Sequence, residues 1–277
     1  MTKHGFKSII VGLDFSPYSK KVLRQAQTLA QLYNAQLTAV YVSYDPSQML
    51  DVPLAFPTEA IATSKLKQKL NQHYKLNEQT TKSIVTYGVP ERELIRIAKK
   101  LRDPLLIVGY KGNSPISRFL LGSTAERLAL RSPVPVWIQR GNQIVEPKRI
   151  LVPHDLMRAT DSALDTAGRF VNGKAPHVEA LFVCQAPLPI LYYEGWIENN
   201  RKIITNANVA VKKFQKTHPK INLKMIKGEA VSSILKRSNS FDLIVLKPHQ
   251  HKEFLHSFGK ITGKVIREVQ VPVLVTR

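Results

Sequence analysis

The sequence predicts an α/β protein made of two tandem doubly wound domains. Short apolar runs rich in β-branched residues alternate with longer segments of helical periodicity, which is typical of βα units around a parallel sheet. Runs such as Ser8–Leu13 are almost continuously apolar, as expected of strands that are buried on both faces. The same succession of runs returns about 140 residues later, which indicates a duplication.

Pairs of similar segments occur in the same order in both halves of the chain. The segment "KSIIVGLD" at 7–14 is matched by "KRILVPHD" at 148–155, and "RSPVPVWIQR" at 131–140 is matched by "EVQVPVLVTR" at 268–277. We therefore expect one domain at residues 1–143 and a second at 144–277, with "GNQIVEPK" as a short linker between them.

In the first copy, the apolar runs predict five strands separated by helices, at residues 6–13, 36–42, 82–87, 104–109 and 134–139. Ser16 followed by Pro17 is a favourable start for the first helix, because serine caps helices and proline suits the first turn. Leu66, Leu70 and Tyr74 recur at a spacing of four residues, which predicts a helix face against the sheet. The lysines between them are expected on its solvated side.

The composition is that of a globular protein with a large excess of positive charge. The chain has 277 residues, a single cysteine and a formal net charge of +21, spread over both halves. Such a surface attracts polyanions, although it can also be merely solvated. The apolar runs are too short to cross a membrane and the N-terminus lacks a signal-peptide pattern, so we expect a cytoplasmic protein without membrane insertion.

Three residues of the first copy lie at predicted strand ends, where open parallel sheets bind their ligands. Asp14 follows the first strand, Val42 ends the second and Gly109 ends the fourth. If the first and fourth strands are neighbours, Asp14 and the loop after Gly109 line one crevice. A carboxylate there could accept hydrogen bonds from a ribose or an adenine amino group.

The loop "VGYKGNSPISRFLLGS" at 108–123 has the features of an anion-binding loop. Gly109 and Gly112 allow a ligand to approach the backbone closely. Gly122 precedes a predicted helix, whose first N–H groups and dipole favour a phosphate. The alternative is a surface loop with turn glycines and a helix cap. The side chains that could add hydroxyl donors or positive charge are Ser123, Thr124, Lys111 and Arg118.

The spacing Gly-x2-Gly-x9-Gly-Ser after an apolar strand, followed by a helix and "PVPVWI", resembles the universal stress protein family. The opening "IIVGLDFSPYSKKVLRQA" resembles the first strand, Asp and helix of that family, and the resemblance covers both halves of the chain. It implies a Rossmann-like, five-stranded parallel sheet of order 3-2-1-4-5 in each domain. The family divides into members that bind ATP through this loop and members that do not.

Carried over to this chain, the resemblance implies an ATP site, with or without Mg²⁺, in the N-terminal domain. Adenine and ribose contacts would come from Asp14, Val42 and Val108. Tyr110 departs from the family pattern, which has a small residue there, and its ring could crowd the ribose or stack over the loop. The residues implied in ribose and phosphate contacts are Gly109, Gly112, Gly122, Ser123 and Thr124.

The second copy keeps Asp155 but has lost the glycine loop. Lys247 stands in the place of Gly109, and Lys260 in the place of Ser123. "GKITGK" at 259–264 does not match the P-loop template, because its spacing is wrong and Val265 follows the final lysine. We expect this site to be empty or altered. The histidines nearby favour a polar loop over a metal site, and they are His249, His251 and His256.

The sequence favours a binding module over an enzyme, because no catalytic set of side chains is legible and ATP hydrolysis would be slow at most. We expect a stress-response or regulatory module that binds ATP in its N-terminal domain. The alternatives are a protein that binds nucleic acid through its positive charge and a nucleotide-free interaction protein. The last strands, "VPVWI" and "VPVLV", are edge strands. The family resemblance implies that such edges pair between domains, so we expect an internal pseudo-dimer, and a further homodimer is left open.

Overall fold

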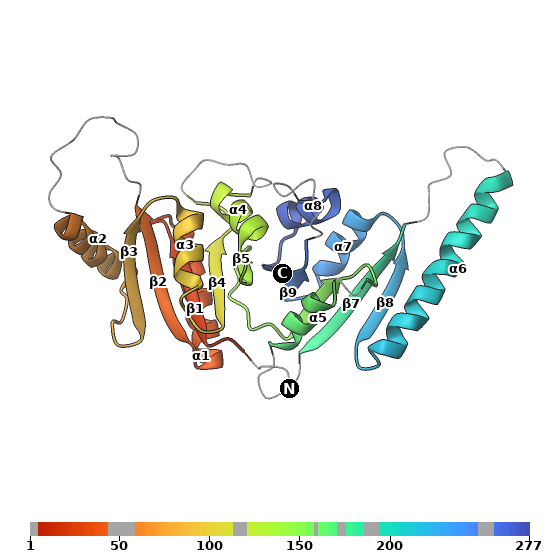
Figure 1. The fold of residues 1–277 in the computed structure, drawn as a ribbon, viewed down its shortest axis with the longest axis horizontal. Coiled ribbons are helices and arrows are strands. Elements are labelled where there is room, and N and C mark those ends of the chain that lie inside the picture. The colour runs from red at the N-terminus through yellow and green to blue at the C-terminus, as the bar shows by residue number, and fades with distance from the viewer. Residues whose placement is uncertain are drawn as a thin grey trace. The chain divides into compact units, whose positions relative to one another are not determined.

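A computed structural model describes residues 5–43, 59–112, 121–157, 160–170, 176–185, 194–248 and 258–277. The chain divides into two compact units, Lys3–Glu146 and Pro147–Thr276, each of which is an α/β domain (Figure 1). Within the described residues, no helix combines the length and apolar character that a membrane span requires.

The first domain alternates strands and helices from its first strand to its last. All neighbouring strands are parallel, in the order β3-β2-β1-β4-β5. The connections through α1 and α2 run one way along the sheet, and those through α3 and α4 run the other way. Because each connection is right-handed, α3 and α4 lie on the face opposite α1 (Figure 1). Its elements are β1 (Ser8–Leu13), α1 (Ser19–Tyr33), β2 (Gln36–Ser43), α2 (Glu59–Tyr74), β3 (Thr81–Tyr87), α3 (Pro90–Ala98), β4 (Pro104–Gly109), α4 (Ser123–Arg131) and β5 (Val136–Gln139).

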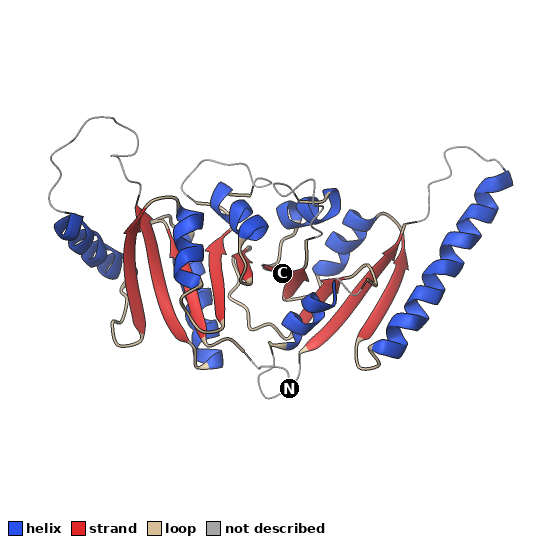
Figure 2. Cartoon of the chain, in the orientation of Figure 1, coloured by secondary structure: helices blue, strands red, loops and turns tan. Residues whose placement is uncertain are grey.

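The second domain repeats this succession (Figure 2). Its strand order is β8-β7-β6-β9-β10, again parallel throughout, so the predicted 3-2-1-4-5 order is confirmed in both domains. Its elements are β6 (Arg149–Pro153), α5 (Asp161–Gly168), β7 (His177–Cys184), α6 (Glu194–Thr217), β8 (Asn222–Lys227), α7 (Ala230–Ser238), β9 (Leu243–Leu246), α8 (Lys260–Glu268) and β10 (Val273–Val275).

The central strands are buried on both faces, as their apolar runs predict. Ile9, Ile10 and Val11 in β1 have no exposed surface, and neither do Leu105–Ile107 in β4. In α2, Leu70 and Tyr74 are buried and Leu66 is half-buried, whereas Lys65, Lys67 and Lys69 are exposed, so the predicted helix face is confirmed.

Ser16 makes the hydrogen bond expected of a helix cap, but the helix begins later than predicted. The Ser16 hydroxyl accepts a hydrogen bond from the Ser19 N–H over 3.1 Å, as a cap would. The regular helix α1 begins only at Ser19, after an intervening turn. Similarly, β5 begins at Val136 rather than at residue 134, because Pro135 has no N–H for the ladder.

Candidate functional site

A cavity of about 240 Å³ opens at the carboxyl ends of β1, β2 and β4 in the first domain. The register between β1 and β2, in which Gly12 lies opposite Val40, brings the ends of these strands together. All eight residues singled out from the sequence line this cavity: Asp14, Val42, Val108, Gly109, Gly112, Gly122, Ser123 and Thr124.

The cavity also has an apolar wall that the sequence reasoning missed. Val40 from β2, together with Pro90 and Leu94 from α3, belongs to the lining. These are ordinary apolar residues that tertiary packing brings to the site, and no local pattern distinguishes them. The lining therefore combines apolar side chains with glycine backbone, hydroxyl groups, one carboxylate and one lysine.

Asp14 is held in place by the turn that follows β1. Its Oδ1 accepts hydrogen bonds from the Ser16 N–H at 3.0 Å and from the Ser19 hydroxyl. Its Oδ2 lies so close to Gly112 that a Cβ atom at that position would overlap it. Glycine at 112 therefore makes room for the Asp14 carboxylate at the edge of the cavity.

The same turn requires a left-handed backbone at Phe15, where φ is 61°. The Phe15 N–H donates to the Tyr74 hydroxyl of α2 over 2.9 Å. The Phe15 ring meets Tyr41 edge to face, with 4.7 Å between centroids. The position of Asp14 thus depends on packing between the end of β1, β2 and α2.

Gly109 and Gly122 let the loop fold close to its surroundings. A Cβ atom at Gly109 would lie 3.1 Å from the Lys111 carbonyl oxygen, and one at Gly122 would lie 3.3 Å from that of Tyr110. The Gly122 N–H donates to the Tyr110 carbonyl over 2.7 Å, so it ties the two ends of the loop together. Gly122 also begins α4 without a capping side chain, which leaves the positive end of the helix open to an anion.

Tyr110 does not line the cavity. Its ring packs edge to face on Tyr18 at 5.1 Å, and the Arg140 guanidinium lies 4.7 Å from its centroid. Whether this ring crowds a ribose or stacks over the loop stays a prediction. Lys111 lines the cavity, with its ammonium 5.4 Å from the Tyr110 ring, whereas Arg118 falls outside the described residues.

The second domain has a cavity of about 230 Å³ at the equivalent strand ends. Asp155 repeats the role of Asp14 in the turn, because its Oδ1 accepts from the Met157 N–H at 2.9 Å and from the Thr160 hydroxyl at 2.7 Å. Lys247 and Ile261 line the cavity in place of Gly109 and Thr124.

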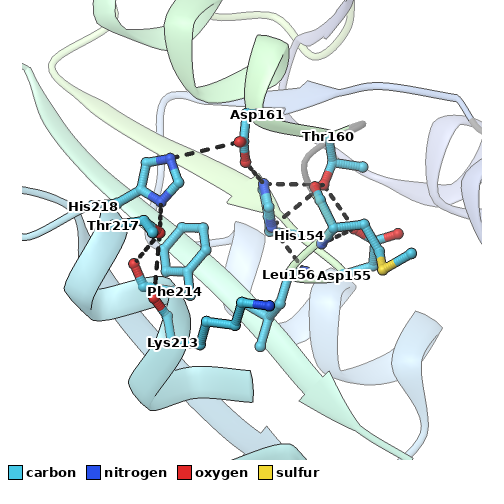
Figure 3. Close-up of polar contacts among 10 residues, drawn as sticks. His154, Asp155, Leu156, Thr160, Asp161, Lys213, Phe214, Thr217 and His218 are labelled. Atoms are coloured by element: carbon cyan, nitrogen blue, oxygen red, sulfur yellow. Dashed lines mark hydrogen bonds and ion pairs between the residues drawn. The ribbon is translucent and has the colours of Figure 1, made fainter. Parts of the chain in front are cut away.

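His154 is a buried residue of this second site that the sequence reasoning did not identify. Its side chain has no exposed surface, and its Nδ1 accepts the Leu156 N–H over 2.9 Å. Its Nε2, which then carries the proton, lies 3.0 Å from the Thr160 hydroxyl and 3.3 Å from Asp161 (Figure 3). Burial lowers the pKa of His154, so the ring is neutral at pH 7.

This cluster does not have the geometry of a catalytic triad or of a metal site. Thr160 and Asp161 meet the same nitrogen of His154, whereas a triad needs them on opposite nitrogens. His218 approaches the other oxygen of Asp161 at 3.7 Å (Figure 3). No group of three metal-ligating side chains occurs in the described parts of the chain, and His249, His251 and His256 lie outside them.

Comparison with known proteins finds one family in both halves of the chain. The model of the universal stress protein family matches residues 5–140 and 146–277. A universal stress protein of Mycolicibacterium smegmatis is 25% identical over 97% of this chain and 96% of its own length. One from Methanocaldococcus jannaschii is 29% identical over 48% of this chain and 81% of its own length.

The solved structures agree with this match at the level of the fold. A universal stress protein from Archaeoglobus fulgidus covers 99% of this chain and 97% of its own, with a TM-score of 0.64 and 18% identity. The succession of two such domains is therefore shared with that protein.

Proposed function

This chain is a tandem member of the universal stress protein family, and from that premise we propose that its first domain binds an adenine nucleotide, with ATP as the expected ligand. The observation that carries the proposal is the convergence of Asp14, the loop glycines and the start of α4 around one cavity. In this proposal the protein acts as a stress-response module whose surface or binding partner changes when a nucleotide is bound.

The chemistry of the walls supports this assignment part by part. An adenine ring suits the apolar side formed by Val40, Val42 and Leu94. A ribose hydroxyl could donate to the Asp14 carboxylate, which the turn already orients. Phosphates suit the other end, where glycine backbone and the first turn of α4 offer N–H groups.

The same lining favours binding over catalysis. Asp14 is the one acidic side chain among the described residues that line the cavity, and its Oδ1 is already hydrogen-bonded. A Mg²⁺ ion that accompanies ATP would therefore rely on phosphate oxygens and water for most of its ligands. The internal pseudo-dimer, a homodimer and nucleic-acid binding stay predictions.

The proposal is tested by calorimetric titration of the whole chain with ATP, using Gly122→Val and a matched control. The valine side chain would meet the Tyr110 carbonyl oxygen at the mouth of the cavity. We expect affinity to fall by about tenfold or more. In the second domain, Gly259→Val adds the same side chain at the start of α8, where no described atom lies within 4 Å, and it should bind ATP normally.

Either of two results would refute the proposal. One is the absence of binding to the wild-type chain at about 1 mM ATP, and the other is equal affinity in Gly122→Val and wild type. Mass spectrometry of nucleotide released from freshly purified protein would identify the adenine nucleotide that the chain prefers.

A further inference from the structure

The second domain has retained the ligand cavity of the fold although its glycine loop has been lost. The cavity has about the volume of the first one, 230 against 240 Å³. It lies among corresponding elements: the ends of β6, β7 and β9 and the start of α8. The space is therefore available to a ligand, and the question is which chemistry its walls select.

The walls of the second cavity lack the glycine backbone that lines the first. Lys247 puts a long side chain where Gly109 lets the backbone approach a ligand, and Ile261 replaces the hydroxyl of Thr124. Most of the remaining wall is hydrocarbon. The residues that form it include Leu181, Val183, Ile234, Leu246 and Val265.

Two charged side chains of opposite sign, Lys247 and Asp155, line this cavity. The Lys247 side chain is half-buried and has no hydrogen-bond or ion-pair partner there. The Asp155 carboxylate is engaged by Met157 and Thr160, and His154 is neutral because its Nδ1 accepts the Leu156 N–H. A lysine at an apolar wall, with no hydrogen-bond partner in the described part of the chain, suits a ligand that brings one negative charge.

We propose that the second-domain cavity binds a small organic monoanion with an apolar body, namely a medium-chain fatty acid or an aromatic carboxylate. Its carboxylate meets the Lys247 ammonium, and its hydrocarbon part lies against Leu181, Ile234 and Leu246. A cavity of this volume holds roughly eight groups the size of a water molecule, at about 30 Å³ each, which is close to the size of octanoate or benzoate.

The test is calorimetric titration of the whole chain with sodium octanoate and with sodium benzoate. Lys247→Met keeps the length of the side chain and removes its charge, and it should weaken binding by about tenfold or more. Lys227→Met makes the same change of net charge at an exposed lysine at the end of β8, and it should leave binding unchanged. Lys247→Arg, which restores the charge, should bind measurably.

Three results would overturn the proposal. The first is that neither acid binds the wild-type chain at about 5 mM. The second is that Lys247→Met, shown by circular dichroism to be folded, binds octanoate as the wild type does. The third is that Gly122→Val abolishes octanoate binding, since the acid would then occupy the first cavity. None of these depends on whether the first domain binds ATP.

Discussion

Acidification should open the turn after β6 in the second domain and leave the equivalent turn of the first domain closed. Both turns contain a residue with a left-handed backbone, Phe15 with φ of 61° and Leu156 with φ of 64°. The N–H of each donates over 2.9 Å, to the Tyr74 hydroxyl in one domain and to Nδ1 of His154 in the other. Of these two groups, only the imidazole nitrogen takes up a proton on mild acidification, and it then no longer accepts a hydrogen bond.

The sign of the effect follows from the pKa of His154, which burial lowers below its ordinary value of 6.5. The carboxylates of Asp155 and Asp161 act in the opposite direction, and His218 adds to the lowering. The unfolded chain therefore binds this proton more readily than the folded chain. The contribution of neutral His154 is complete above pH 6.5 and is lost as the pH falls below that value.

The size of the effect is set by one proton and one hydrogen bond. A single proton changes the free energy of unfolding by at most about 1.4 kcal/mol per pH unit. Protonation also turns Nδ1 of His154 into a donor that faces the Leu156 N–H, and a buried donor without a partner costs about 1–3 kcal/mol. Over the pH range from 7 to 5.5, we expect the protection of this amide to fall by up to about tenfold.

Amide hydrogen exchange measured by NMR, corrected for the intrinsic pH dependence of exchange, separates the two turns within one sample. The Leu156 amide should lose protection on acidification, and the Phe15 amide should not. His154→Asn keeps an acceptor near the position of Nδ1 without a titrating group, so its Leu156 amide should stay protected. The reasoning is wrong if Leu156 protection is independent of pH in the wild type, or if the Asn variant loses as much.

Two substitutions test other contacts. Gly112→Ala would place a Cβ against the Asp14 carboxylate, so we expect about tenfold weaker ATP binding by calorimetry with little loss of stability. Unchanged affinity would show that ATP binding does not require the Asp14 carboxylate in its present position. Arg237→Ala leaves the buried Glu179 carboxylate without its two hydrogen bonds of 2.7 and 2.6 Å, and should cost about 3 kcal/mol in urea unfolding. Arg96→Ala, which removes an exposed ion pair, is the control and should cost less than about 1 kcal/mol.

The fold could be predicted from the sequence because strands buried on both faces leave a strong local signal. The apolar run at Ser8–Leu13 is the strand β1 itself, and the run at 104–109 is β4. Strand ends depend on single backbone groups, such as the N–H that Pro135 lacks, and the apolar pattern does not show these groups. The strand order came from the family resemblance, since periodicity alone does not specify which strands are neighbours.

Only those residues of the candidate site that belong to a local sequence motif could be predicted. Glycine spacing and a strand-end Asp indicate a loop, whatever lies around it. Val40 and Leu94 reach the cavity through packing between elements far apart in the chain, and nothing in their immediate sequence marks them. The orientation of the Tyr110 ring depends on Tyr18 and Arg140, which lie 92 and 30 residues away in "FSPYS" and "WIQRG".

The shared fold requires a hydrogen-bond acceptor for certain backbone N–H groups, but it does not specify which side chain supplies it. The two domains differ at such a position. The turn after the first strand needs an acceptor for one N–H, and a tyrosine hydroxyl and an imidazole meet that need with nearly the same backbone. Such exchanges cost the fold little, because hydrogen-bond length and φ are almost unchanged. They alter the response to protons strongly, because only one of the two acceptors titrates near neutral pH. The loss of the Leu156 hydrogen bond on acidification should therefore map to His154 and its neighbours, even though the two turns are copies of one another.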